Sequence, residues 1–318
     1  MTVRKRGQKL FYGAVSSAFL VLASVYLYHN LPDLSSLPYV GAPYALALLA
    51  ASVSVFVLLG QEQRILLRFY NTDLSQLESF SLVVSNNFLN YFPAKAGIAA
   101  RGIYFRTTHG LPLTHYTAAT ISAQLIHLLI AGIIGAITGM LLIQTLPHSP
   151  ALNSIIVAFS VLGLASAAVL MLARHISSWF SRSNLGRRFS ALADAPSFAS
   201  APKPLAVYST LIVLTFLLMS ARLWLSFDVS GIRLSALQVL LIQTAAAASI
   251  AFSVLPGNIG IREGVIVAIG AALGLPPGTV LAAALLDRLS ALAISFTCGP
   301  LFISRLIRRM QVSQQNRI

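Results

Sequence analysis

The sequence has little charge, few acidic residues and almost no cysteine. Only 9% of its 318 residues are Asp, Glu, Lys or Arg, whereas a typical soluble domain carries about 25%. Hydrophobic residues make up 57% of the chain, and the mean hydropathy is +0.80, so solvated groups cannot cover a folded surface. This composition excludes a soluble monomer, and also a disordered chain, which needs the opposite balance. The class that remains is an all-α polytopic membrane protein.

The residue patterns of common enzymes and metalloproteins are also missing. The single cysteine, Cys298, excludes disulfides within the chain, CxxC zinc sites and iron–sulfur clusters. His109, His115 and His127 are scattered, without an HExxH, DxD or Cys/His spacing, so we predict no metal site. No Ser/His/Asp arrangement or nucleotide-binding glycine loop is present. We therefore predict no cofactor, no catalytic residues and no enzymatic activity.

Six apolar stretches are long enough to cross a bilayer core of about 30 Å. The first follows a basic start, as in a signal peptide, but it is longer than the apolar part of one and ends in aromatic residues. We therefore predict that it is kept as a transmembrane helix. The six predicted spans are residues 10–28, 44–60, 114–145, 152–173, 205–227 and 279–303.

The basic residues are numerous but concentrated in a few connections. The chain has 22 Lys and Arg against 8 Asp and Glu, a formal net charge of +14. Of the 22, 15 lie in the N-terminus, the 61–76 loop, the 174–204 connection and the C-terminal tail. The positive-inside rule then places both termini and these connections in the cytoplasm. Because the excess is a topology signal plus attraction to anionic membrane lipids, we predict no nucleic-acid binding.

Two further apolar regions are interrupted by proline and glycine. In the region 236–276, the run after the break has about 12 residues, or roughly 18 Å as a helix, which is too short to cross the membrane. The charge distribution requires each region to enter and leave on the same face. We therefore predict two re-entrant helical hairpins, 77–112 and 236–276, although a pair of complete crossings satisfies the same parity. The breaks are marked by Pro93, Gly97, Pro256, Gly257 and Gly260.

The two interrupted regions resemble each other. Residues 93–97 align with residues 256–260 at an offset of 163, and Gln124 falls opposite Asp287 at the same offset. By the predicted topology, the first hairpin enters from the cytoplasm and the second from outside. We predict one membrane domain over residues 1–318 that contains an inverted repeat, as in secondary transporters, with chance matching as the alternative. Its halves are residues 10–146 and 152–305, with a cytoplasmic connection at 174–204.

Charged residues inside the membrane are costly and usually functional. Arg222, inside the fifth span, is expected to extend its side chain outward to the interface, and Glu78 to stay at the interface. The remaining charges gather on the two hairpins and the last span. Together with one asparagine at the second break, they are our candidates for substrate binding: Lys95, Arg101, Arg106, Asn258, Arg262, Glu263, Asp287 and Arg288.

These candidates allow two interpretations. The neighbours Arg262–Glu263 and Asp287–Arg288 can pair across helices and neutralise one another. Lys95, Arg101 and Arg106 then remain without acidic partners, either reaching the interface or lining a cavity with surplus positive charge. Such a cavity, next to broken-helix N-termini and open glycine backbone, suits an anion such as a phosphate.

Three motifs resemble those of the lysylphosphatidylglycerol synthase transmembrane-region family, a flippase-like membrane domain. Residues 255–264, with the pattern Pro-Gly-x-x-Gly-x-Arg-Glu, are the most specific match. Residues 93–101 resemble the family's Pro-x-x-x-Gly-x-x-x-Arg motif, and residues 287–289 its arginine-bearing final motif. The resemblance covers residues 10 to 305. One departure is Gln124-Leu125, where the family often has Glu-Arg.

The resemblance implies lipid translocation across the bacterial cytoplasmic (inner) membrane, with an anionic lipid as substrate. Two-domain relatives carry an aminoacyl-transferase domain after the membrane part, and the chain ends at Ile318, so we do not expect synthase activity. We predict a flippase for a phosphate-bearing lipid, either a modified phospholipid or a polyprenyl-phosphate-linked one. Alternatives are a membrane-embedded lipid-modifying enzyme and an accessory subunit without transport of its own. The partners expected are membrane lipids, and the sequence leaves a homodimer open.

Overall fold

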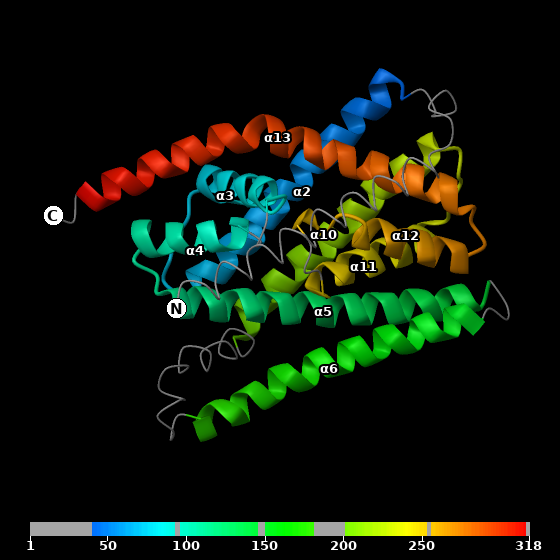
Figure 1. Cartoon of the computed structure of the whole chain (residues 1–318). Helices are drawn as coiled ribbons and strands as arrows, with labels where there is room; N and C mark the ends of the chain where they lie inside the picture. Colours follow the sequence, from blue (N-terminus) through cyan, green and yellow to red (C-terminus); the bar gives the residue numbers. More distant parts are fainter. Residues whose placement is uncertain (1–39, 93–95, 146–149, 181–200, 253–255, 316–318) are drawn as a thin grey trace, which may run out of the picture.

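The computed structural model describes residues 40–92, 96–145, 150–180, 201–252 and 256–315 (Figure 1). Three predictions concern other residues and lie outside this part of the chain. They are the first span, the pair Pro93 and Lys95, and most of the connection that follows residue 180.

Within the described residues the protein consists of helices without strands. Proline begins three of them, at Pro150, Pro202 and Pro277, where its missing N–H has no helical partner to lose. The α-helices are α2 (Ala42–Arg68), α3 (Gln76–Leu89), α4 (Ala96–Thr108), α5 (Leu113–Ile143), α6 (Pro150–Phe180), α10 (Pro202–Val229), α11 (Ala236–Phe252), α12 (Ile261–Ala272) and α13 (Pro277–Gln315).

Five helices are long and apolar enough to cross a membrane: α2, α5, α6, α10 and α13. They correspond to the five predicted spans that lie within the described residues, and they confirm a polytopic helical membrane protein. Three helices, α2, α6 and α13, continue beyond the predicted spans. Helix α2 continues past Gly60 to Arg68, because Leu66 and Leu67 in that segment are buried by other helices. Helix α13 continues through the basic tail to Gln315.

Both interrupted regions form two short helices separated by a break. Helices α3 and α4 have 14 and 13 residues, and α12 has 12, so each is about 20 Å long. The members of each pair, α3 with α4 and α11 with α12, pack against each other. At the second break, a single 3₁₀ turn (Pro256–Asn258) carries Gly257 at φ 61° and Asn258 at φ 56°. Glycine adopts this left-handed backbone without the steric cost of a Cβ atom.

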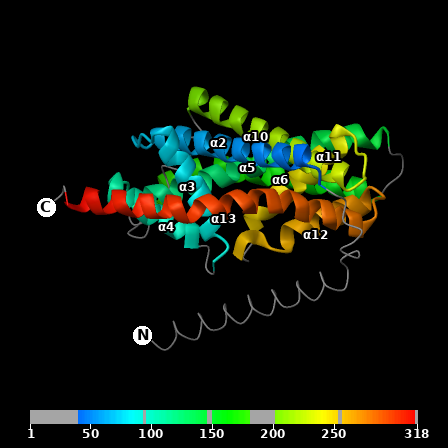
Figure 2. The same ribbon diagram turned by 90° about the horizontal axis from the view of Figure 1, so that it is seen from above.

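The helices around the two breaks cross over one another in space. Helix α13 of the second half packs on α3, helix α5 of the first half packs on α11, and α2 packs on α10. Figures 1 and 2 show α13 running along the molecule above α3 and α4 and past α12. Each hairpin is therefore enclosed partly by the other half of the chain.

Helix α6 is attached through α5 at the edge of the bundle (Figure 1). Small residues allow α5 and α6 to approach each other closely, because a Cβ atom on Gly132 would lie 2.5 Å from the Cα of Gly163. One and two turns further on, Gly135 and Gly139 make room for Phe159 and Ile156 of α6. The glycine run of α5 is thus a packing surface.

Candidate functional site

The two breaks meet each other. The backbone N–H of Gly257 donates to the carbonyl oxygen of Asn90, with 2.6 Å between the two atoms. A Cβ on Gly257 would lie 2.5 Å from the ring of Tyr91, so glycine is required for this contact. In the first hairpin, Gly97 packs closely on the carbonyl oxygen of Asn86. The C-terminal end of α3 is thereby held against the 3₁₀ turn that precedes α12.

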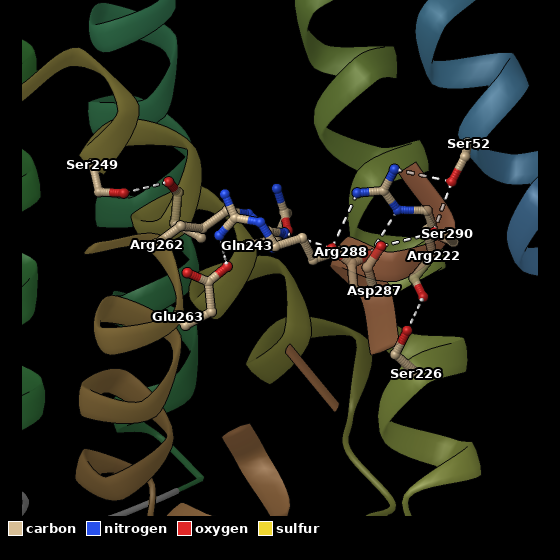
Figure 3. Close-up of polar contacts among 11 residues, drawn as sticks. Ser52, Arg222, Ser226, Gln243, Ser249, Arg262, Glu263, Asp287, Arg288 and Ser290 are labelled. Atoms are coloured by element: carbon tan, nitrogen blue, oxygen red, sulfur yellow. Dashed lines mark hydrogen bonds and ion pairs between the residues drawn. The ribbon is translucent and has the colours of Figure 1, made fainter. Parts of the chain in front are cut away.

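A buried carboxylate, Asp287, joins two arginines from other helices (Figure 3). Arg222 of α10 donates through Nε to Oδ1 at 2.7 Å and through Nη2 to Oδ2 at 3.0 Å. Arg262 of α12 donates to Oδ2 at 2.7 Å. Asp287 is 0% exposed and the arginines 4% and 8%, so the charges are desolvated and depend on one another.

The prediction that Arg222 reaches the interface is wrong. Its guanidinium points inward, where Nη1 also donates to Ser52 Oγ at 3.2 Å, and Ser52 shares a 2.9 Å hydrogen bond with Ser290. The reason is the position of Asp287, which lies on the face of α13 that packs on α10. A polar face on α10, with Thr215 and Ser226 at helical spacing from Arg222, was the available signal.

A second ion pair links the second break to α13. Arg288 of α13 donates to Glu263 and to the carbonyl oxygen of Gly257, and it lies 5.6 Å from the ring centre of Tyr91. Glu263 also accepts the backbone N–H of Gly260 at 2.8 Å, which caps the N-terminus of α12. Thus Arg262–Asp287 and Arg288–Glu263 pair across helices, as in the first of the two interpretations above.

The second half therefore contains a paired network of three arginines and two carboxylates, with a net charge of +1. Gln243 of α11 joins it by accepting from Arg262 at 3.2 Å. Asn258 lies beside it, 9% exposed, and both amide atoms of its side chain lack a partner among the described residues. That Asn258, Arg262, Glu263, Asp287 and Arg288 bind substrate stays a prediction.

Helices of both halves line a cavity of about 350 Å³. This volume falls in the range of small-molecule sites, about 300–1,000 Å³. Its wall is mainly apolar and comes from α2, α3, α4, α5, α10 and α11. The polar side chains on the wall are few, and the main ones are Glu62, Gln63, Arg101, Gln124, His127 and Thr215.

Arg101 is the positively charged group of this cavity. It is partly buried, its Nε donates to the hydroxyl of Tyr116 at 3.0 Å, and its guanidinium lies 5.8 Å from that ring's centre. The hydroxyl of Tyr116 donates in turn to the carbonyl oxygen of Ile98 at 3.1 Å. Arg106, on the same helix, is exposed and does not line the cavity. Of these two sequence candidates, Arg101 lines the cavity and Arg106 does not.

Glu62 and His127 face each other in the cavity wall and were not among the sequence candidates. Nε2 of His127 lies 3.0 Å from Oε2 of Glu62, and the hydroxyl of Thr215 donates to Oε1 of Glu62 at 2.6 Å. Gln124, the position opposite Asp287 in the sequence repeat, also lines this cavity. No feature of the sequence pairs Glu62 with His127, since 65 positions separate them.

A separate cluster lies where α3, α4 and α13 meet. Glu78, 7% exposed, accepts from Tyr104, from His109 at 2.9 Å and from Arg309 at 3.0 Å. The side chain of Glu78 is buried among these partners, and its place at the membrane interface stays a prediction. This cluster fixes the C-terminal part of α13 to the first hairpin. Among the described residues, no group of three or more His, Cys, Asp or Glu side chains could hold a metal ion.

Comparison with protein families now bears on this arrangement. The family model described as the lysylphosphatidylglycerol synthase TM region matches residues 10–299. The chain belongs to this family. The match to the lysylphosphatidylglycerol synthase TM region includes both breaks, the buried network and the cavity, and it confirms the family resemblance of the three sequence motifs. No curated protein and no solved structure matches the chain significantly.

Proposed function

We propose that this protein translocates a phosphate-bearing lipid across the cytoplasmic membrane. Its family links it to lipid handling, and its helices make it a multi-pass membrane protein. The observation that carries the proposal is the cavity with Arg101 in an otherwise mainly apolar wall. An anionic headgroup can pair with the guanidinium there, while acyl or prenyl chains lie against the apolar surfaces of the surrounding helices.

The packing pattern supports an inverted repeat of the two halves. In each half, a long helix, a broken pair and a second long helix follow in the same order. If α3 corresponds to α11 and α5 to α13, the contact of α3 with α13 corresponds to the contact of α11 with α5. We propose that both pairs are re-entrant hairpins and that the termini are cytoplasmic, as the basic loops indicate.

Transport rather than lipid modification is favoured by the state of the carboxylates. Each of the buried carboxylates in the described residues, Glu62, Glu78, Glu263 and Asp287, has a cationic or imidazole partner. A carboxylate that acts as general acid or base in cleaving or transferring a headgroup must be free to approach the substrate, and each of these is held by a partner. We therefore propose no enzymatic activity, and we retain the accessory-subunit alternative as an outcome of the following test.

The test is lipid movement in liposomes that contain the purified protein and a fluorescent anionic phospholipid, read by quenching from outside. We expect Arg101→Ala to slow movement by about tenfold or more, because a charge-assisted hydrogen bond contributes about 1.5–3 kcal/mol. Arg106→Ala is the matched control, since it removes the same charge from an exposed position on the same helix. Equal rates for the two variants would contradict the site, and an inactive wild-type protein would favour an accessory role.

A further inference from the structure

The Glu62–His127 pair has a geometry that requires a proton. Nδ1 of His127 lies 2.8 Å from the carbonyl oxygen of Ala123. A carbonyl oxygen only accepts hydrogen bonds, so Nδ1 carries a hydrogen and donates it there. In a neutral ring the other nitrogen, Nε2, then has no hydrogen and is itself an acceptor.

That second nitrogen faces another acceptor. Nε2 lies 3.0 Å from Oε2 of Glu62, and an ionised carboxylate has no hydrogen to donate. Two acceptors at this distance repel each other unless one proton lies between them, on the ring or on the carboxylate. Thr215 does not supply it, because its hydroxyl is directed at the other carboxylate oxygen, Oε1. The observed contact is therefore that of a pair holding one additional proton.

The pair also faces the cavity. The side chain of His127 is 29% exposed and that of Glu62 is 5% exposed, and both line the cavity that contains Arg101. The other titratable groups facing this cavity are Tyr116 of α5 and Tyr208 of α10. The ring of Tyr208 lies 6.0 Å from that of His127, edge to face. Helices α3 and α11 contribute Val83, Asn86, Ala247 and Ala248 to the wall and no titratable group.

We propose that Glu62 and His127 form a proton-binding site coupled to the loading of the cavity with an anionic headgroup. This inference rests on the proposed function, because it names what regulates the occupancy of the same cavity. With the proton bound, the pair is neutral, and Arg101 gives the cavity a charge of +1. Without the proton, the ionised Glu62 balances Arg101, and the cavity has no net charge.

Binding of an anion and of the proton must then support each other. Coupling between two ligands is reciprocal, so protonation of the pair raises anion affinity by the factor by which the anion raises proton affinity. We expect affinity for an anionic phosphodiester to fall by about tenfold as the pH rises through the range in which histidine changes charge, about pH 5 to 8.

Two near-isosteric variants hold the pair in the charge state with the additional proton and in the charge state without it. In Glu62→Gln, the amide N–H₂ donates to Nε2 of a neutral His127, so the cavity keeps its charge of +1 without an added proton. In His127→Gln, the amide donates to an ionised Glu62, so the cavity stays neutral. The first variant should bind an anion tightly at every pH in this range and the second weakly, both without pH dependence.

The binding experiment uses dihexanoylphosphatidylglycerol below its micelle concentration, added to the full-length protein in detergent. Its phosphodiester keeps one negative charge throughout this pH range, so a pH effect belongs to the protein. Dihexanoylphosphatidylcholine, which has no net charge, should bind with little pH dependence. A wild-type affinity for the anionic lipid that does not change with pH, or two variants with equal affinities, would overturn the proposal.

A ligand-free measurement separates this inference from the proposed function. In protein with ¹⁵N-labelled histidine, the His127 signal is assigned by its loss in His127→Gln. We expect the ring to be neutral with hydrogen on Nδ1 in Glu62→Gln, and to carry or share the additional proton in the wild type. Identical ring spectra in the two proteins, together with an ionised carboxyl signal from ¹³C-labelled Glu62 in the wild type, would overturn the proton site even if lipid transport is found. A protein that moves no lipid but shows the expected spectra would refute only the proposed function.

Discussion

The two broken helix pairs share one architecture but are stabilised by opposite means. At the second break, Asp287 and Arg288 of α13 join Arg222, Arg262 and Glu263 in a network that excludes water. At the first break, the helices are held by close backbone packing at Gly97, and the space beyond encloses a cavity. The arginines at the second break are paired with carboxylates, whereas Arg101, near the first break, remains available in the cavity.

We propose that this difference reflects a division of roles between the two halves of the proposed repeat. Buried ion pairs are rigid only while every partner is present, so the second break serves as a fixed support. The cavity polar groups have fewer partners and some exposure, which is what a site that binds and releases a ligand requires. In the proposed repeat, the contact of α10 with α13 through Arg222–Asp287 corresponds to the contact of α2 with α5 through Glu62–His127.

The largest effect is expected from Asp287→Ala, which leaves Arg222 and Arg262 buried without a counter-charge. Removing one partner of a buried pair costs about 3–5 kcal/mol, so thermal unfolding in detergent should occur at a much lower temperature. Asp73→Ala is the control, because that carboxylate pairs with Arg68 at the surface and exposed pairs contribute less than about 1 kcal/mol. Equal losses of stability in the two variants would show that the buried network stabilises the protein no more than the surface pair does.

An intermediate effect is expected from alanine at Gly97, where the first break is held by packing. The new Cβ would lie 2.4 Å from the carbonyl oxygen of Asn86, and overpacking of this kind costs about 1–3 kcal/mol. Gly264→Ala is the matched control on α12, because no atom lies within 4 Å of its Cβ position. There alanine should stabilise the protein by about 0.5–1 kcal/mol, so unfolding temperatures that shift in the same direction would contradict the packing assignment.

The smallest change in stability, with a clear change in transport, is expected from Gln124→Glu. This residue is exposed within the cavity, so a carboxylate stays solvated there and stability should change by less than about 1 kcal/mol. Its charge opposes an anionic headgroup beside Arg101, and the rate of lipid movement should fall several-fold. Gln144→Glu at the far end of α5 is the control, and equal rates in these two variants would show that cavity charge does not govern transport.

Much of the fold could be predicted from the sequence because membranes impose simple rules. Apolar runs of sufficient length identify α2, α5, α6, α10 and α13, and Pro and Gly identify both breaks. Helices α2 and α13 extend beyond the predicted spans because they continue into polar segments where other helices bury one face. Hydropathy averages over a window and does not register such a face.

The site could be predicted only where partners lie close in a motif. Pairing among Arg262, Glu263, Asp287 and Arg288 is one of the two interpretations because opposite charges are adjacent on each segment. The inward direction of Arg222 and the contact of Glu62 with His127 depend on which helix faces pack together. That information is tertiary, and in one sequence it has no periodic signature stronger than a few polar residues on the buried faces.

Helix α13 has a mechanical consequence through its length. Its 39 residues extend about 58 Å at about 1.5 Å per residue, and one continuous rod touches both breaks. Asp287 anchors it at the second, while Gly299 packs against Phe88 beside the first and Arg309 ties its end to Glu78. A change in the tilt of α13 at one break is therefore expected to move the helix at the other break. Pro300 lacks the backbone N–H that would bond one turn back, so it weakens the helix between these anchors and limits how much of the tilt is transmitted.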